Sequence, residues 1–143
     1  MFIGEYEYKI DKKNRLAIPV KFRDKLKKGM VATRGIDTCL SIYTKESWEK
    51  LVKKLRDLPI SKSKNRAFNR LMLAGAMDKE LDSQGRITLP DFLMKYANLS
   101  KKAIIAGLYD RLEIWDKQIW EEYKKRSEAS SSDIAEALDE IGI

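Results

Sequence analysis

The sequence has 143 residues, 43% of them hydrophobic and 36% charged, and a formal net charge of +7 from 29 Lys and Arg against 22 Asp and Glu. This suffices for one compact domain, and no apolar run approaches the length of a transmembrane helix. The single cysteine, Cys39, and the lack of histidine exclude disulfide frameworks, Cys/His zinc sites and histidine-based catalysis, and no cofactor is predicted.

The first predicted elements are two strands and a short helix. Residues 2–10 alternate apolar and polar side chains, as a strand with one buried face does. A turn at residues 11–15 is expected to reverse the chain into a second strand, residues 16–18, so that the two strands form a hairpin. Pro19 suits the start of an amphipathic helix that ends near Gly29.

Two further strands and a longer helix complete the first half of the chain. The apolar stretches at residues 30–32 and 40–43 predict strands. Cys39, beside the second stretch, is expected to be a small buried residue rather than a reactive thiol. Thr44 can cap the helix that apolar spacing predicts over residues 45–58.

A helical segment is expected between the two halves, within residues 59–76. Phe68, Met72 and Gly75 fall on one helical face, and small residues around Gly75 permit close packing. A flexible linker is the weaker alternative, because this stretch is mostly apolar. We therefore predict an inter-repeat helix.

The second half is expected to repeat the order of the first. Predicted elements are strands at residues 77–81, 87–89, 103–106 and 112–115, a helix over residues 90–96, and a second helix capped by Asp116. The acidic C-terminal tail, residues 127–143, begins with a low-complexity serine-rich break. Its later part fits either a short acidic amphipathic helix or a mobile segment, and partial disorder is favoured.

A duplicated stretch of nine residues is the main internal repeat. Residues 11–19 and 82–90 carry an acid, an arginine and a proline at matching positions. The correspondence continues downstream, pairing Phe22 with Leu93, Leu26 with Ala97, Gly35 with Gly107, Leu40 with Leu112, Ile42 with Ile114, Tyr43 with Trp115 and Trp48 with Trp120. Two homologous halves in one domain follow, with a first repeat over residues 1–58 and a second over residues 77–126.

The local chemistry of the repeated stretch predicts a tight turn before each arginine. Asn14 and Gly85 occupy the same site, and both residue types tolerate positive φ. Asp11 and Asp82 can accept hydrogen bonds from turn amides, and are expected to organise each turn. The direction of each arginine would then depend on its turn.

The positive charge is concentrated before the tail. From Glu128 onward the chain holds five acids and no base, so the preceding part carries 29 bases against 17 acids, a net charge of +12. A body this basic favours a polyanionic partner, with nucleic acid ahead of an anionic membrane. A simply solvated lysine-rich surface is the alternative.

These features resemble one known family. The opening Met1-Phe2-Ile3-Gly4, the paired Asp-x-x-x-Arg turns with a proline four residues after each arginine, and the tandem halves are similar to the MraZ family of bacterial transcription regulators. The resemblance extends to about Tyr123 and does not cover the acidic tail. Asn14 stands where the family usually has glycine, and is expected to support the same turn.

The resemblance implies a fold and a function. Each half would resemble the swapped-hairpin unit of AbrB and SpoVT, giving an α+β fold with a β-rich barrel formed by two tandem repeats and flanking helices. Family members form ring-like homo-oligomers. They bind repeated operator boxes upstream of the division and cell-wall gene cluster, usually as repressors. A cytoplasmic, nucleoid-associated protein is expected, and the amino terminus shows no signal-peptide pattern.

By position, Arg15 and Arg86 inherit the role of DNA-contacting arginines. An arginine fork can donate two hydrogen bonds to guanine O6 and N7, whereas Lys21 and Arg23 would neutralise phosphates. A salt bridge to the acid of its own turn is the alternative role of each arginine. The predicted DNA-binding residues are Arg15, Arg86, Lys12, Lys13, Asn14, Ser83, Gln84 and Gly85.

Two other classes of protein remain. An antitoxin-like interaction module would use the acidic segment at residues 133–141 to wrap a protein partner. An enzyme would use Asp11 and Asp82 as paired carboxylates, but neither has a nucleophile, a metal-ligand cluster or a phosphate-cradling loop beside it in the sequence. No enzymatic activity is expected.

Overall fold

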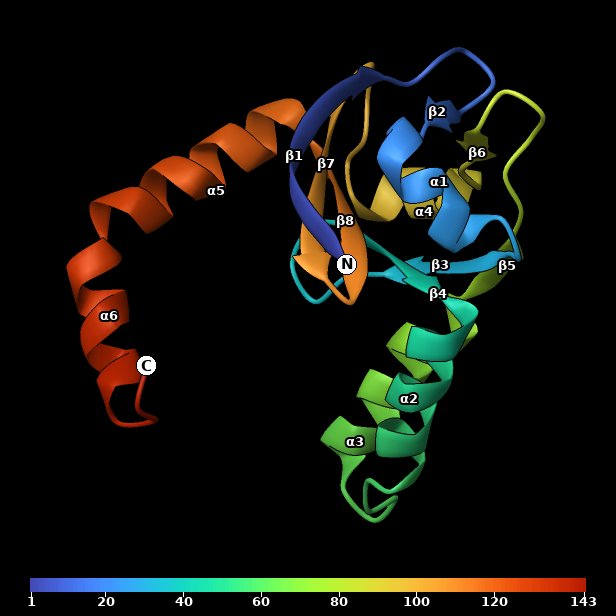
Figure 1. Ribbon diagram of the computed structural model, residues 1–143. Helices are drawn as coiled ribbons and strands as arrows, with labels where there is room; N and C mark the ends of the chain where they lie inside the picture. The colour runs from blue at the N-terminus through green and yellow to red at the C-terminus, as the bar shows by residue number, and fades with distance from the viewer.

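Eight strands and seven helical segments make up the computed structural model, which describes residues 1–143 (Figure 1). The strands are β1 (Phe2–Lys9), β2 (Arg15–Ala17), β3 (Met30–Arg34), β4 (Leu40–Thr44), β5 (Met77–Lys79), β6 (Arg86–Thr88), β7 (Lys102–Tyr109) and β8 (Arg111–Asp116). The helices are α1 (Val20–Leu26), α2 (Lys45–Arg56), α3 (Ser63–Asn69), the π-helix η1 (Arg70–Ala74), α4 (Asp91–Tyr96), α5 (Lys117–Ala129) and α6 (Ser131–Asp139).

The order of strands shows that the two halves are interleaved. Six antiparallel strands form one sheet in the order β1-β7-β8-β4-β3-β5, and β2 pairs with β6 in a separate ladder. If each strand of the first half is exchanged with its counterpart in the second, the same order results, read from the opposite edge of the sheet. The α+β class and the two tandem repeats are confirmed, although no ring of strands closes into a barrel.

The predicted local hairpin of residues 2–10 with residues 16–18 is wrong. The turn between them forms, but β1 pairs with β7 along its whole length, and only one bridge, between Ile10 and Leu16, joins the two predicted partners. The hydrogen bonds of β2 go to β6 of the other half. Each half therefore pairs its first two strands with strands of the other half.

Both repeats contribute matching residues to a single core. Leu16, Leu26 and Ile18 from the first half and Ile87 and Leu93 from the second have no exposed surface. The remaining buried members of this cluster are Phe2, Ile10, Phe22, Met30, Ala32, Leu40, Ile42, Leu89, Ala97, Ala103, Ile105, Leu112 and Ile114. The pairs matched in sequence, such as Phe22 with Leu93, thus occupy corresponding places in one core.

Both predicted helix caps are present. The Thr44 hydroxyl accepts a hydrogen bond from the Ser47 amide at 3.1 Å, and the Asp116 carboxylate accepts from the amides at the start of α5. These bonds satisfy amides that the first turn of a helix leaves free. Cys39 is fully buried immediately before β4, and burial raises the pKa of its thiol to about 12.

The segment between the halves is helical, and its last turn widens into the π-helix η1. The Thr33 hydroxyl donates to the Met72 carbonyl at 2.6 Å, and Arg34 donates to the Leu71 carbonyl at 3.1 Å. A Cβ at Gly75 would lie 2.8 Å from an Arg34 nitrogen, so a small residue is required there. Side chains of β3 thus bind the carbonyls of η1.

The prediction of partial disorder in the tail is wrong. Residues 131–139 form helix α6, which follows α5 after one intervening residue, Ser130. Ile134 and Leu138 beyond the serine-rich break have helical spacing, and every residue from 128 onward is exposed. No helix of the chain has the length and apolar character needed to cross a lipid bilayer.

The shared core makes a stability prediction. Leu16→Ala should lower the free energy of unfolding by about 2 to 5 kcal/mol, because it leaves a cavity where β2 meets β6. Val20→Ala, at a position 73% exposed, is the matched control and should change stability by less than about 0.5 kcal/mol. Denaturant unfolding measures both, and equal effects would mean that the β2 side chain is not part of the core.

Candidate nucleic-acid interface

The first repeated turn is built around the carboxylate of Asp11. Its Oδ1 accepts hydrogen bonds from the amides of Lys13 and Arg15, both at 2.9 Å. The Asp11 carbonyl accepts from the Asn14 amide at 3.0 Å, and Asn14 has a φ of 60°. An asparagine tolerates this left-handed conformation better than most residues, so the turn closes on the acid.

The second turn has the same geometry. Oδ1 of Asp82 accepts from the amides of Gln84 and Arg86, both at 2.9 Å, and its carbonyl accepts from the Gly85 amide at 3.0 Å. Gly85 has a φ of 74°. The two halves therefore build one turn twice, with asparagine in one copy and glycine in the other.

Each arginine is bound to the acid of its own turn. Nε of Arg15 donates to Oδ2 of Asp11 at 2.6 Å, and Nε of Arg86 donates to Oδ2 of Asp82 at 2.8 Å. The salt bridge proposed as the alternative role is thus present in both turns. No other hydrogen bond involves either guanidinium, so the outer Nη groups are left for a ligand while the carboxylate fixes the direction of the fork.

The β2–β6 ladder brings both arginines to one face. Residue Arg15 lies opposite Thr88, and Ala17 lies opposite Arg86, so all four share the face away from the core. The central pair, Leu16 and Ile87, points into the core with no exposed surface. Because side chains alternate along a strand, burying the central pair holds the two arginines outward together.

Each turn also bonds to the strand of the other half. The Ile18 amide donates to the Gly85 carbonyl at 3.0 Å, and the Leu89 amide donates to the Asn14 carbonyl at 2.8 Å. These matching bonds extend the ladder at both ends. The two turns are consequently held in a fixed relation to each other.

The surroundings of the two turns differ, which sequence reasoning missed. Beside the first turn, Nδ2 of Asn14 donates to Asp91 at the start of α4, at 2.8 Å. Over the second turn lies Arg23, whose Nε donates to the Ile18 carbonyl at 2.8 Å. A Cβ at Gly85 would collide with this guanidinium. The repeat alignment could have revealed the difference, because the counterparts of Asp91 and Arg23 are not charged.

The remaining predicted residues lie at the tips and on α1. Lys12 and Lys13 are exposed at the first tip, and Ser83 and Gln84 are exposed at the second. The first tip therefore carries two positive charges and the second is neutral. Lys21 is not at either turn: its ammonium lies 4.9 Å from the ring centroid of Tyr6 on β1.

The electrostatics of the turns follow from these bonds. The amide of Arg15 is the main cause that lowers the pKa of the Asp11 carboxyl, and the amide of Arg86 does the same for Asp82. Each carboxylate is thereby occupied by its own amides and arginine. Both pKa values thus move away from neutral pH, whereas a general acid or base works best with a pKa near the operating pH.

The fold and the turns define a class: a module of two interleaved repeats that presents paired, acid-anchored arginines from one face. The family model described as "MraZ protein, putative antitoxin-like" matches residues 1–71 and again residues 72–141. The chain belongs to the MraZ family. The second match runs through the acidic tail, which the sequence resemblance did not cover.

Full-length relatives carry the same family name. A protein of Caldanaerobacter subterraneus subsp. tengcongensis and one of Thermoanaerobacter sp. (strain X514) are each 45% identical to this chain over 143 residues. A protein of Thermoanaerobacter pseudethanolicus is 46% identical over the same length. Both chains are covered completely in each case, and each relative is named "Transcriptional regulator MraZ".

The lowered pKa values of Asp11 and Asp82 make the free energy of unfolding depend on pH. Asp11 and Asp82 have folded-state pKa values below the usual 3.8, so their contribution is complete above about pH 5 and is lost as the pH falls through the folded-state values. Between about pH 5 and pH 2, the free energy of unfolding should fall less in the Asp11→Asn/Asp82→Asn variant than in the parent. Parallel curves for the variant and the parent would show that these acids do not stabilise the turns.

Proposed function

We propose that this chain is a sequence-specific DNA-binding regulator of transcription. The observation that carries the proposal is the presentation of Arg15 and Arg86 on one face of the β2–β6 ladder, each held at Nε and free at its outer nitrogens. The names of the full-length relatives support it. A repressor that acts on repeated operator boxes upstream of the division and cell-wall gene cluster is the specific form we propose.

Recognition of guanine is the chemistry that fits the arginines. Major-groove guanine offers two acceptors, O6 and N7, and a rigid guanidinium can donate to both at once. Arg15 and Arg86 are already oriented by their acids, so these side chains would lose little conformational freedom on binding. Asn14, Gly85 and the polar tips Ser83 and Gln84 would present these side chains to the groove.

Phosphate contacts would supply most of the affinity. Lys12 and Lys13 at the first tip are exposed and have no carboxylate partner. Each phosphate that such a side chain neutralises releases counterions, so binding depends on salt and hardly on sequence. A protein bound in this way would be associated with the nucleoid in the cytoplasm.

An antitoxin-like module is the second candidate. The description of the matching family model supports it, as do the exposed apolar residues of α6. Such a module would copurify with a different protein in fixed proportion. A regulator of transcription would instead protect DNA upstream of its own gene in a footprint, which makes footprinting the first experiment.

Exchange of the arginines tests direct recognition. Arg15→Lys and Arg86→Lys keep the charge and lose the fork, so each should weaken operator binding by roughly 1 to 3 kcal/mol while binding to random DNA barely changes. Titration of labelled operator and random duplexes measures both. Thermal melting is the control, because both arginines are partly buried and paired with an acid, so a loss of folding has to be separated from a loss of recognition.

Two outcomes would contradict direct recognition. Full operator preference in the lysine variants would mean that these arginines are structural partners of Asp11 and Asp82. Loss of binding only at temperatures where the variant unfolds would mean the same.

Repeated boxes test the proposed ring of copies. An oligomer that places several modules on several boxes gains effective concentration, so affinity should rise by on the order of a hundredfold or more from one box to several correctly spaced boxes. Duplexes with one to four boxes, titrated at fixed salt, measure the rise. Equal affinities, or a rise only in proportion to box number, would rule out simultaneous engagement.

A further inference from the structure

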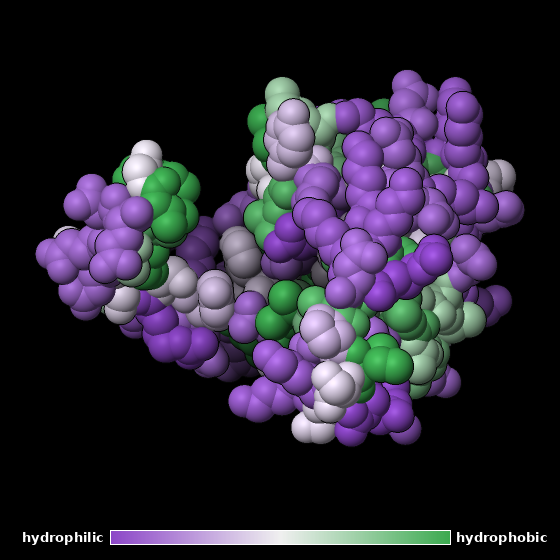
Figure 2. Space-filling model, turned by 90° about the horizontal axis from the view of Figure 1, so that it is seen from below, coloured by the Kyte–Doolittle hydropathy of each residue, from purple (hydrophilic) through white to green (hydrophobic).

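Helices α5 and α6 form an arm that leaves the body of the molecule. In Figure 1 the arm runs outward from β8 and ends far from the hairpin of α2 and α3. Every residue from 128 to 143 is exposed. Figure 2 shows hydrophobic side chains on this separate lobe, so apolar groups are displayed where no part of the chain covers them.

The uncovered residues form one stripe on α6 and just beyond it. Ile134, Leu138 and Ile141 are spaced by four and three residues, which places them on the same helical face, and Ile141 is 69% exposed. Asp133 and Glu140, seven residues apart, lie together on one flank of this stripe. This is the pattern of a helix that docks in a groove with apolar anchors and an acidic edge.

The base of the arm is fixed to the body. Trp115 on β8 contacts Trp120 and Tyr123 of α5, with ring centroids 5.4 and 5.0 Å apart. Lys117 and Lys124 form ion pairs at 3.0 Å with Glu7 and Glu5 of β1. These contacts set the direction in which α5 leaves the sheet.

The connection to α6 prevents a return toward the same body. In the first half, residues 57–62 separate α2 from α3 and allow the chain to reverse, whereas only Ser130 separates α5 from α6. Helix α6 occupies the same place in its repeat as α3 does. It therefore extends where its counterpart folds back, and any surface that covers it would come from another molecule.

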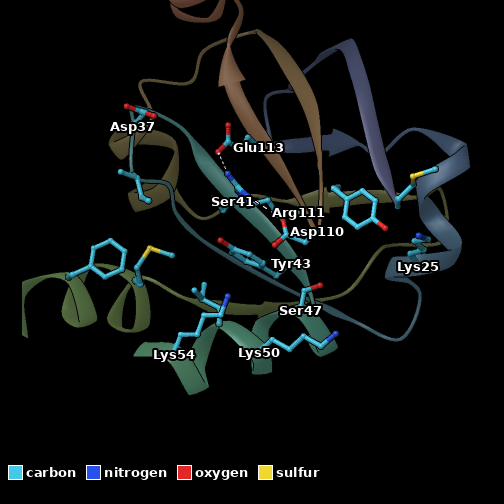
Figure 3. Close-up of a pocket in the computed structure, with 16 residues that line it drawn as sticks. Lys25, Asp37, Ser41, Tyr43, Ser47, Lys50, Lys54, Asp110, Arg111 and Glu113 are labelled. Atoms are coloured by element: carbon cyan, nitrogen blue, oxygen red, sulfur yellow. Dashed lines mark hydrogen bonds and ion pairs between the residues drawn. The ribbon is translucent and has the colours of Figure 1, made fainter. Parts of the chain in front are cut away.

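A groove on the body of the molecule combines apolar surface with basic side chains, as a surface that binds the stripe of α6 would. Its volume is about 630 Å³, and it lies between α2, the α3–η1 segment and the strands β4 and β8. Tyr43, Leu51, Phe68 and Met72 provide apolar surface along it, and Ile36 at its rim is 76% exposed. Figure 3 shows Asp37 and Lys25 on opposite sides of this groove, with Tyr43 between them.

The groove lining has four basic and three acidic side chains, and two of the bases stand together on α2. Arg111 is paired with Asp110 at 3.2 Å and with Glu113 at 3.4 Å, so this trio carries a net charge of −1. Lys25 and Lys54 have no carboxylate partner, and Lys50 has only a long contact with Glu46 at 3.5 Å. Figure 3 shows Lys50 and Lys54 on α2, along one edge.

We propose that α6 of one copy docks in this groove of a second copy of the chain. Ile134, Leu138 and Ile141 would enter between α2 and η1, with Asp133 and Glu140 toward Lys50 and Lys54. Arm and groove are different surfaces, so the contact is heterologous and continues from copy to copy until a ring closes. The inference rests on the proposed assembly of copies, but involves neither of the arginine turns.

Substitutions on the two faces of α6 test the contact. Ile134→Asp/Leu138→Asp should weaken self-association by more than about tenfold, because it places charge on the buried stripe. Ser132→Asp adds one negative charge to the opposite face and should leave association unchanged. Sedimentation of the full chain across concentration measures both. Thermal melts at dilutions where the parent is unassociated should agree with the parent, because α6 does not pack on its own body.

A charge exchange tests the partner surface. Lys50→Glu/Lys54→Glu should weaken association, and addition of Asp133→Lys/Glu140→Lys to the same chain should restore it, since each groove then meets the reversed arm. A monomeric parent, unchanged association in the Ile134→Asp/Leu138→Asp variant, or no restoration by the exchange would each overturn the proposal.

Binding to a duplex with one box separates this inference from the proposed function. The Ile134→Asp/Leu138→Asp variant should bind one box as the parent does, because its turns are intact. If neither protein binds the box while their association differs, the docking proposal stands and the DNA proposal fails. If both bind it and their association is the same, the docking proposal fails alone.

Discussion

The antiparallel pairing of β2 with β6 is the contact on which the rest of the structure depends. These strands have only three residues each, and one comes from each half of the chain. Their central residues, Leu16 and Ile87, are fully buried, which fixes the register, since a shift by one residue would turn core side chains outward. The same register places both arginines on the face away from the core and joins each turn to the opposite strand.

Much of this could be predicted from local sequence. The left-handed residues Asn14 and Gly85 and the capping residues Thr44 and Asp116 depend on neighbours a few positions away, and all four have the predicted conformation or contact. The partner of each strand could not be predicted in this way, because alternation shows which face of a strand is buried and says nothing of the strand beside it. The false hairpin at residues 2–18 is the result.

The geometry of the two turns could be predicted because it depends on nearby residues. Their surroundings could not, because they depend on residues far away in the sequence. The bonds of Asp11 and Asp82 lie within their own turns, whereas Asp91 and Arg23 reach the turns from distant positions in the chain. These two residues, together with the basic first tip and the neutral second tip, make the turns chemically different. A pseudo-symmetric scaffold thus presents two similar arginines in unequal surroundings.

The direct contact between the arginines and guanine N7 is the central claim, and replacement of the guanine tests it at the level of one atom. Once a footprint defines the boxes, 7-deazaguanine can be placed at each guanine, which removes the N7 acceptor and leaves the base pair. If the claim holds, this replacement weakens binding of the parent but adds little to the loss already caused by Arg15→Lys/Arg86→Lys, because both remove the same bond. If the loss of binding from the base replacement and the loss from the arginine variants simply add, at every guanine of the box, the claim is contradicted.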